Sequence, residues 1–134
     1  MKIGELARLT GCTVETLRFY ERRGLLDALS RSESNYRSYD ESSVRRIQFI
    51  RHCRSLDIGL DEIIQLLASR DAPEEDCGSV NALIDRHIDQ VAERIAQLTS
   101  LREELLTIRG RCNARSTSSD CAILRELSKP EAAA

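Results

Sequence analysis

The sequence predicts a mainly α-helical chain, built from a small N-terminal head followed by one long helix. Two observations support this prediction. Residues 80–109 contain neither proline nor glycine, and their apolar residues recur every three or four positions, which is the period of one helix face. Residues 1–70 hold four shorter stretches with helical patterning, separated by turns. At 134 residues the chain has the length of about one domain.

The long helix carries a narrow apolar stripe, which shifts by one place after Leu98. A stripe this narrow favours a partner helix, and the simplest partner is the same helix of a second copy. We therefore expect a homodimer joined by an antiparallel coiled coil. The predicted dimer-interface residues are Ile84, Ile88, Val91, Ile95, Leu98 and Leu105.

Three cysteines stand at the two ends of this helix: Cys77 before it, and Cys112 and Cys121 after it. Thirty helical residues would separate Cys77 from Cys112 of the same chain by roughly 45 Å. In an antiparallel homodimer, however, Cys77 of one chain meets Cys112 and Cys121 of its partner. The spacing thus predicts two equivalent three-cysteine sites across the interface. The alternative is that all three are small surface or core residues.

Three thiolates form a soft, negatively charged donor set, which favours polarisable cations over Mg²⁺ or Ca²⁺. Structural zinc takes four ligands, and no fourth cysteine or histidine is placed to complete such a set. The set suits Pb(II), Hg(II), or Cd(II) with an additional oxygen ligand. His87 lies ten residues after Cys77, about three helical turns along the helix, and we expect it to be a half-exposed polar residue rather than a ligand.

The N-terminal pattern is typical of a helix-turn-helix. Residues 3–9 and 13–22 form two short amphipathic helices around a turn that contains Gly11, and Thr13 is placed to cap the second helix. Thr16 and Arg18 fall on the exposed face of that helix, where Arg18 can reach a phosphate or a base edge. The alternative is a helical hairpin with no nucleic-acid partner.

Residues 25–39 interleave arginines with tyrosines in a turn-rich stretch that includes Arg31, Tyr36 and Arg37. This pattern indicates a wing lying on a phosphate backbone. The alternative is a surface hairpin whose tyrosines pack on the head. Asp40 is expected to cap a third helix that runs to about Ser55. The arginines placed on the outward face of that helix, where they can extend a phosphate-contacting surface, are Arg45, Arg46, Arg51 and Arg54.

Charge is divided unevenly along the chain. Residues 1–59 carry eleven Lys/Arg and eight Asp/Glu, a net +3, whereas residues 60–134 carry nine and fourteen, a net −5. A basic first half suits a polyanionic partner. Because the sequence shows neither a signal peptide nor a long apolar run, we expect a cytoplasmic protein with no membrane partner. No nucleophile–base set or phosphate-binding glycine loop is evident, so we do not expect an enzyme.

Several motifs together resemble the MerR family of bacterial transcription regulators. They are Ile3-Gly4-Glu5-Leu6-Ala7, Thr13-Val14-Glu15-Thr16-Leu17-Arg18-Phe19-Tyr20-Glu21, Gly24-Leu25-Leu26, Asn35-Tyr36-Arg37-Tyr39 and Leu60-Asp61-Glu62-Ile63. Around the cysteines the sequence is similar to the cadmium- and lead-responsive (CadR- and PbrR-like) branch. The motifs are Cys77-Gly78-Ser79-Val80-Asn81, Arg111-Cys112-Asn113 and Cys121-Ala122-Ile123-Leu124.

The resemblance implies a winged helix-turn-helix homodimer bound to double-stranded promoter DNA. Such a dimer represses without metal, and with metal it distorts the DNA so that RNA polymerase can align on the promoter of a heavy-metal resistance operon. The implied effector is Pb(II) or Cd(II), with Hg(II) or Zn(II) possible, and the implied ligands are Cys77, Cys112 and Cys121. The implied DNA contacts are Thr16, Arg18, Tyr20, Arg31, Tyr36, Arg37 and Arg54.

The predicted organisation follows from these assignments. It comprises a winged helix-turn-helix domain (1–70), a connector with a metal ligand (71–79), a dimerisation helix (80–110), a metal-binding loop with a short helix (111–128) and a disordered tail (129–134). Two other functions remain open on the residues alone. One is a thiol redox sensor, or a sensor of another soft ion, on the same DNA-binding frame, and the other is a metal buffer with no DNA role.

Overall fold

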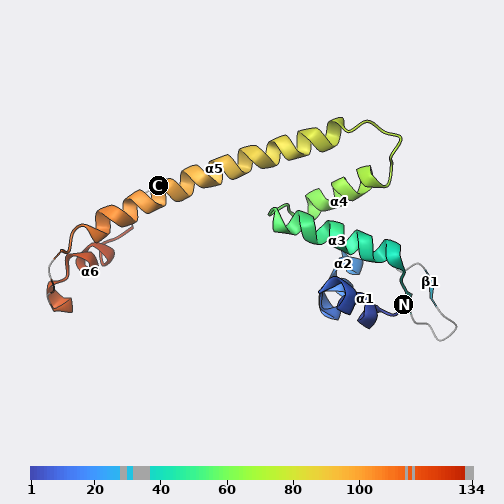
Figure 1. Cartoon of the computed structure of the whole chain (residues 1–134). Helices are drawn as coiled ribbons and strands as arrows, with labels where there is room; N and C mark the ends of the chain where they lie inside the picture. Colours follow the sequence, from blue (N-terminus) through green and yellow to red (C-terminus); the bar gives the residue numbers. More distant parts are fainter. Residues whose placement is uncertain (28–29, 32–36, 114, 116, 132–134) are drawn as a thin grey trace. The chain divides into compact units, whose positions relative to one another are not determined.

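The computed structural model describes residues 1–27, 30–31, 37–113, 115 and 117–131 (Figure 1). The chain divides into two compact units, Met1–Asp85 and Arg86–Ala134. As predicted, the described part is mainly helical. In order, its elements are α1 (Ile3–Thr10), α2 (Val14–Arg22), β1 (Ser30–Arg31), β2 (Arg37–Ser38), α3 (Glu41–Ser55), α4 (Leu60–Arg70), α5 (Gly78–Arg109), a 3₁₀ turn (Ser118–Asp120) and α6 (Ala122–Leu127).

The turn between α1 and α2 is fixed by backbone and side chain together. Gly11 ends α1 with φ +70°, a left-handed conformation that glycine adopts without the usual Cβ penalty. Arg51 of α3 donates a hydrogen bond to the Thr10 carbonyl, and a Cβ at Gly11 would lie 2.7 Å from Arg51 Nη1. The Thr13 hydroxyl accepts from the Thr16 backbone N–H at 3.1 Å, which confirms the predicted cap.

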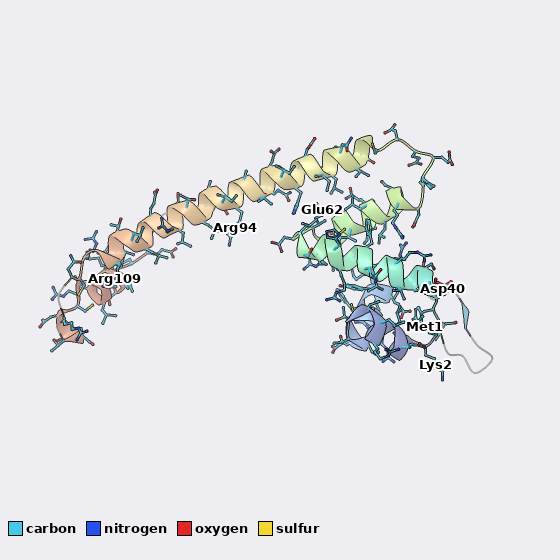
Figure 2. All side chains as sticks on the ribbon, in the orientation of Figure 1. Met1, Lys2, Asp40, Glu62, Arg94 and Arg109 are labelled. Atoms are coloured by element: carbon cyan, nitrogen blue, oxygen red, sulfur yellow. The ribbon has the colours of Figure 1, made fainter. Side chains whose placement is uncertain are left out.

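The third helix begins at the predicted cap. Asp40 is labelled at the start of α3 in Figure 2. Its carboxylate accepts hydrogen bonds from the backbone N–H groups of Ser42 at 2.9 Å and Ser43 at 3.3 Å. The Ser42 hydroxyl, which donates to the same oxygen, makes the largest contribution to the lowered pKa of Asp40. An ionised aspartate at this end of a helix satisfies N–H groups that have no partner within the helix.

The segment around the β1–β2 hairpin is tied to the head by Tyr39. The hairpin is antiparallel, with Ser30 opposite Ser38 and Arg31 opposite Arg37. The Tyr39 side chain is 1% exposed, and its hydroxyl donates to Glu21 Oε1 at 2.6 Å. Tyr39 is therefore a core residue. For this tyrosine the structure agrees with the alternative interpretation given above, a surface hairpin whose tyrosines pack on the head.

The hydrophobic core of the first unit draws on every helix from α1 to α5. Leu83, in the second turn of α5, is 2% exposed and belongs to this core, with Val80 packed against it. The start of the long helix is thus part of the head. The core residues are Leu6, Ala7, Leu17, Tyr20, Leu25, Leu26, Tyr39, Ile47, Ile50, Cys53, Ile58, Ile63, Leu66, Leu67 and Leu83.

Leu83→Ala is expected to lower the free energy of unfolding of the head by about 2–5 kcal/mol, because it removes buried methyl groups and leaves a cavity. Urea denaturation followed by circular dichroism measures this change. Asp85→Ala, an exposed change on the same helix, is the control and should have little effect. Equal midpoints for the two variants would show that the start of α5 is not anchored in the core.

The second unit contains most of α5, a 32-residue helix, and α6. Beyond Leu83, the large apolar residues of α5 are exposed in the single chain, except Ile108, which is half-buried. They include Ile88 (59%), Val91 (44%), Ile95 (60%), Leu98 (47%) and Leu105 (57%). Over the described residues, no helix combines the length and apolar character needed to cross a membrane.

Candidate DNA-contacting face and cysteine sites

The exposed side of α2 carries Arg18, whose side chain is free of the core, as predicted. Thr16 is half-buried, and its hydroxyl bonds with that of Thr13 at 2.9 Å. Tyr20 differs from expectation: it is 8% exposed and packs in the core. Burial is the largest cause of the raised pKa of its hydroxyl. Its ring is therefore structural, and a contact of Tyr20 with DNA stays a prediction.

A cationic cluster at the end of α2 was not singled out from the sequence. The guanidinium carbons of Arg22 and Arg23 lie 6.0 and 5.9 Å from the centre of the Phe19 ring, which is 37% exposed. Arg23 also pairs with Asp61 at the start of α4 at 2.9 Å. The signal was available in the sequence, since Phe19, Arg22 and Arg23 have the i, i+3 and i+4 spacing of helix neighbours.

The outward arginines of α3 are partly engaged with the protein itself. Arg46 is half-buried, and its Nε donates to the Leu25 carbonyl at 2.6 Å, so the expectation that it faces solvent was wrong. Arg54 is exposed, as a phosphate contact requires, but donates to the Ile58 carbonyl at 3.0 Å. A guanidinium has five N–H donors, so binding one carbonyl leaves others available.

The predicted wing residues are described only in part. The backbones of Arg31 and Arg37 form the hairpin pair, whereas Tyr36 lies outside the described residues. A short antiparallel pair of strands, such as β1 and β2, is the arrangement expected of a wing. The DNA contacts assigned to these three residues stay predictions.

Cys77 is exposed and immediately precedes α5 in the first unit. Its sulfur lies 3.8 Å from the Asn81 amide nitrogen, which can donate to it. The Asp76 carboxylate accepts from the Gly78 N–H at 2.8 Å and so shapes the turn into α5. The thiol is thus accessible to solvent, directly before the N-terminus of α5.

Cys112 and Cys121 lie together in the second unit, joined by a hydrogen bond between their side chains. Two contacts hold the turn that leads out of α5. Arg109, labelled near the end of α5 in Figure 2, donates through Nη1 to the Cys112 carbonyl at 2.6 Å. The Asn113 amide donates to the Gly110 carbonyl at 3.0 Å. Both thiols are half-buried. Residues nine positions apart are therefore brought into one thiol pair.

The pKa of the Cys121 thiol is held below its ordinary value. The largest cause is the backbone N–H of Leu124, and the Ile123 N–H, the Cys112 side chain and Arg125 act in the same direction against desolvation. Thiolate is the form that binds metal ions and attacks electrophiles. Cys121 is thus prepared for ligation by its surroundings.

Cys121 is expected to react with iodoacetamide at lower pH in the folded protein than in the urea-unfolded chain, because the folded structure favours its thiolate. The rate is measured by mass spectrometry of the Cys121 peptide across a pH series. The stability that this shift contributes is present above the unfolded-state pKa and is lost as pH falls through the folded-state pKa. Coincident midpoints in the folded and unfolded chain would contradict the assignment.

Among the described residues of a single chain, no three His, Cys, Asp or Glu side chains are grouped so as to hold a metal ion. The structure brings Cys112 and Cys121 together, while Cys77 belongs to the other compact unit. His87 is half-buried on α5, as expected. A three-cysteine site would therefore need a thiol from elsewhere beside the Cys112–Cys121 pair.

Comparison with known proteins identifies the family. Residues 1–70 match the family described as MerR HTH family regulatory protein, and residues 44–108 match that described as MerR, DNA binding. The chain belongs to the MerR family. Its resemblance to MerR regulators, inferred above from motifs, is thereby confirmed, and the family is one of transcription regulators rather than enzymes.

Individual MerR relatives match over most of their lengths. The crystal structure of the regulator PbrR691 from Ralstonia metallidurans, in complex with lead(II), is 50% identical with a TM-score of 0.87, covering 96% of this chain and 99% of that one. MerR from Bacillus megaterium, in complex with mercury(II), is 27% identical with a TM-score of 0.73, covering 96% and 100%. A ZntR homolog of Haemophilus influenzae is 45% identical, covering 81% of each chain.

Proposed function

We propose that this MerR-family protein is a metal-responsive transcription regulator of a heavy-metal resistance operon. Its homodimer binds promoter DNA, represses without metal and activates by distorting the DNA when Pb(II) or Cd(II) binds. The bound ion is held by Cys77 of one protomer and by Cys112 and Cys121 of the other. RNA polymerase is the partner that aligns on the distorted promoter and starts transcription.

The observation that carries this proposal is the Cys112–Cys121 thiol pair. Two thiols in hydrogen-bond contact, one with a lowered pKa, supply two of the three donors. A helix of 32 residues separates this pair from Cys77 in the sequence, and an antiparallel partner is the simplest source of the third thiol. The donor set is soft and lacks a fourth cysteine, which fits a three-coordinate Pb(II) or Hg(II), or Cd(II) with an added oxygen.

The exposed apolar residues of α5 support the dimer on which the site depends. Isolated exposed apolar side chains are common, but a stripe along one helix favours burial against a partner. In the single chain, Ile84, Ile88, Val91, Ile95, Leu98 and Leu105 are all between 36% and 60% exposed. An antiparallel two-fold axis would bury both copies of this stripe and bring each helix start to the other helix end.

The identity of the effector rests on two kinds of support. The thiol chemistry favours soft ions as a class. Within that class, the 50% identity to a lead(II)-bound regulator favours Pb(II) over the mercury(II) bound by the 27% identical relative. Cd(II) is retained because its coordination preferences are met by the same thiols plus oxygen, and Zn(II) and Hg(II) are the competing ions.

Metal binding must favour one arrangement of the dimer on DNA over the other. Moving a two-state promoter from mostly off to mostly on needs about a 10⁴-fold preference, roughly 5.5 kcal/mol. Thiolate–metal bonds made in only one arrangement supply a difference of that order. The start of α5 transmits it, because Cys77 precedes this helix and Leu83, six residues later, is part of the head's core.

The proposal is tested by ultraviolet titration and in vitro transcription with Pb(II), Cd(II), Hg(II) and Zn(II). Thiolate-to-metal charge-transfer bands should saturate at about two ions per dimer, and transcription should rise with Pb(II) or Cd(II). Cys77→Ser should abolish the transcriptional response while leaving operator binding intact. Cys12→Ser, at a half-buried cysteine of the first unit, is the matched control and should respond like the native protein. A full response by Cys77→Ser would remove Cys77 from the site.

A thiol redox sensor is the second candidate, favoured by the same Cys112–Cys121 contact. A hydroperoxide would oxidise one thiolate to a sulfenic acid, releasing the alcohol or water. The other thiol would then displace water to form the disulfide. Induction by hydroperoxide in metal-free buffer, persisting in Cys77→Ser but lost in Cys112→Ser, would favour this function over metal sensing.

A further inference from the structure

One guanidinium in the head contacts two segments that the proposed function needs to move together. Arg46 of α3 donates through Nε to the Leu25 carbonyl at 2.6 Å. Its Nη1 also pairs with the Asp71 carboxylate, at 3.1 Å from Oδ2 and 3.4 Å from Oδ1. Leu25 follows α2 on the way to the hairpin, and Asp71 ends α4 on the way to Cys77.

The position of Asp71 indicates that its carboxylate serves this contact rather than α4 itself. Asp71 is the C-terminal cap of α4, with its N–H bonded to the Leu67 carbonyl. A negative charge at that end of a helix opposes the helix dipole and gains nothing locally. An ion pair exposed to this degree, 52% at Asp71, also adds little to stability.

The other end of the contact is rigid. Leu25 is fully buried, and its backbone N–H donates to the Tyr20 carbonyl at 2.8 Å. The Arg46 side chain is only 23% exposed, and a planar guanidinium held by a carbonyl on one edge and a carboxylate on another has little rotational freedom. A displacement of Asp71 is therefore passed to the Leu25 peptide.

We propose that Arg46 and Asp71 are positioning residues that couple the connector carrying Cys77 to the segment leading into the hairpin. This inference rests on the proposed metal-responsive function and names the route by which the metal site acts on the head. When the connector shifts, Asp71 pulls the guanidinium, and the guanidinium shifts the Leu25 carbonyl. The ion pair affects the metal response if it forms in one of the two states of the head and not in the other, so its small free energy becomes a difference between them.

Asp71→Asn tests the coupling, since it removes the charge and keeps the size, whereas loss of Arg46 would remove both contacts at once. The matched control is Asp61→Asn, which removes the same charge from the other end of α4 and breaks the pair with Arg23. Without metal, both variants should bind the operator like the native protein. With metal, the induction ratio of Asp71→Asn should fall about threefold, which is the effect of an exposed ion pair, and that of Asp61→Asn should not fall. Asp71→Glu should recover part of the loss.

A second measurement decides the inference without metal. Hydrogen exchange of the peptide covering residues 24–27 should become faster in Asp71→Asn than in Asp61→Asn, because the Arg46 guanidinium that donates to the Leu25 carbonyl is no longer held by the Asp71 charge. Equal exchange and equal induction in the two variants would overturn the coupling. If the native protein does not respond to metal, the proposed function fails, while the exchange comparison still decides whether Arg46 links the two segments.

Discussion

Mixing Cys77→Ser chains with Cys112→Ser chains is expected to restore metal binding that neither variant shows alone. In a mixed dimer, one site combines the intact Cys77 of one chain with the intact Cys112 and Cys121 of the other, and the second site carries both defects. Random exchange makes about half of the dimers mixed, so about one ion is bound tightly for every two dimers. A site contained within one chain would never be restored by mixing.

The measurement is charge-transfer absorbance on co-refolded chains, with each variant alone as a baseline. A mixture of Cys112→Ser and Cys121→Ser chains is the matched control: both defects fall on the same side of the site, so mixing them should restore nothing. Recovery in this control, or none in the Cys77→Ser mixture, would refute a site shared between antiparallel protomers.

Ile95→Glu is expected to convert the dimer into monomers and so abolish tight operator binding. Ile95 is 60% exposed in the single chain and lies in the middle of the α5 stripe. Loss of a buried anchor costs about 2 kcal/mol or more, and two-fold symmetry repeats it, so the dissociation constant should rise roughly a thousandfold. A carboxylate placed in an apolar interface adds further to this loss.

Sedimentation equilibrium and operator titration measure these two effects. Gln90→Glu adds the same charge on the other side of α5 and should leave the dimer intact. Five residues turn the helix by about 500°, which places Gln90 about 140° around the helix from Ile95. A dimeric Ile95→Glu protein would place the interface elsewhere.

The sequence was sufficient for the helices because their limits are set by local chemistry. Thr13 and Asp40 cap the helices they were expected to cap, and Gly11 ends α1 in the conformation that glycine allows. The resemblance to MerR regulators, carried by motifs spread along the chain, was confirmed by the family match.

The sequence was not sufficient to predict the direction in which a side chain points when that direction depends on tertiary packing. Tyr20 follows two exposed positions on α2, and only the packing of α2 against the core places its ring inside. Leu83 was not recognised as a core residue, since a helix start next to a connector carries no sign of what it packs against. Arg46 was expected to face solvent, but it donates to the Leu25 carbonyl. Sequence periodicity does not show that a backbone carbonyl from a distant turn lies beside a helix.

The way in which Gly11 and Arg51 hold the turn between α1 and α2 also bears on how the sequence of such a protein can change during evolution. The left-handed turn and the Arg51 contact to the Thr10 carbonyl hold the turn between α1 and α2 without using the exposed side of α2. We therefore expect substitutions at the exposed residues Glu15 and Arg18 to leave the orientation of α2 unchanged. Under the proposed contact of α2 with promoter DNA, exchange of these two residues is expected to change which operator is bound while the rest of the head stays the same.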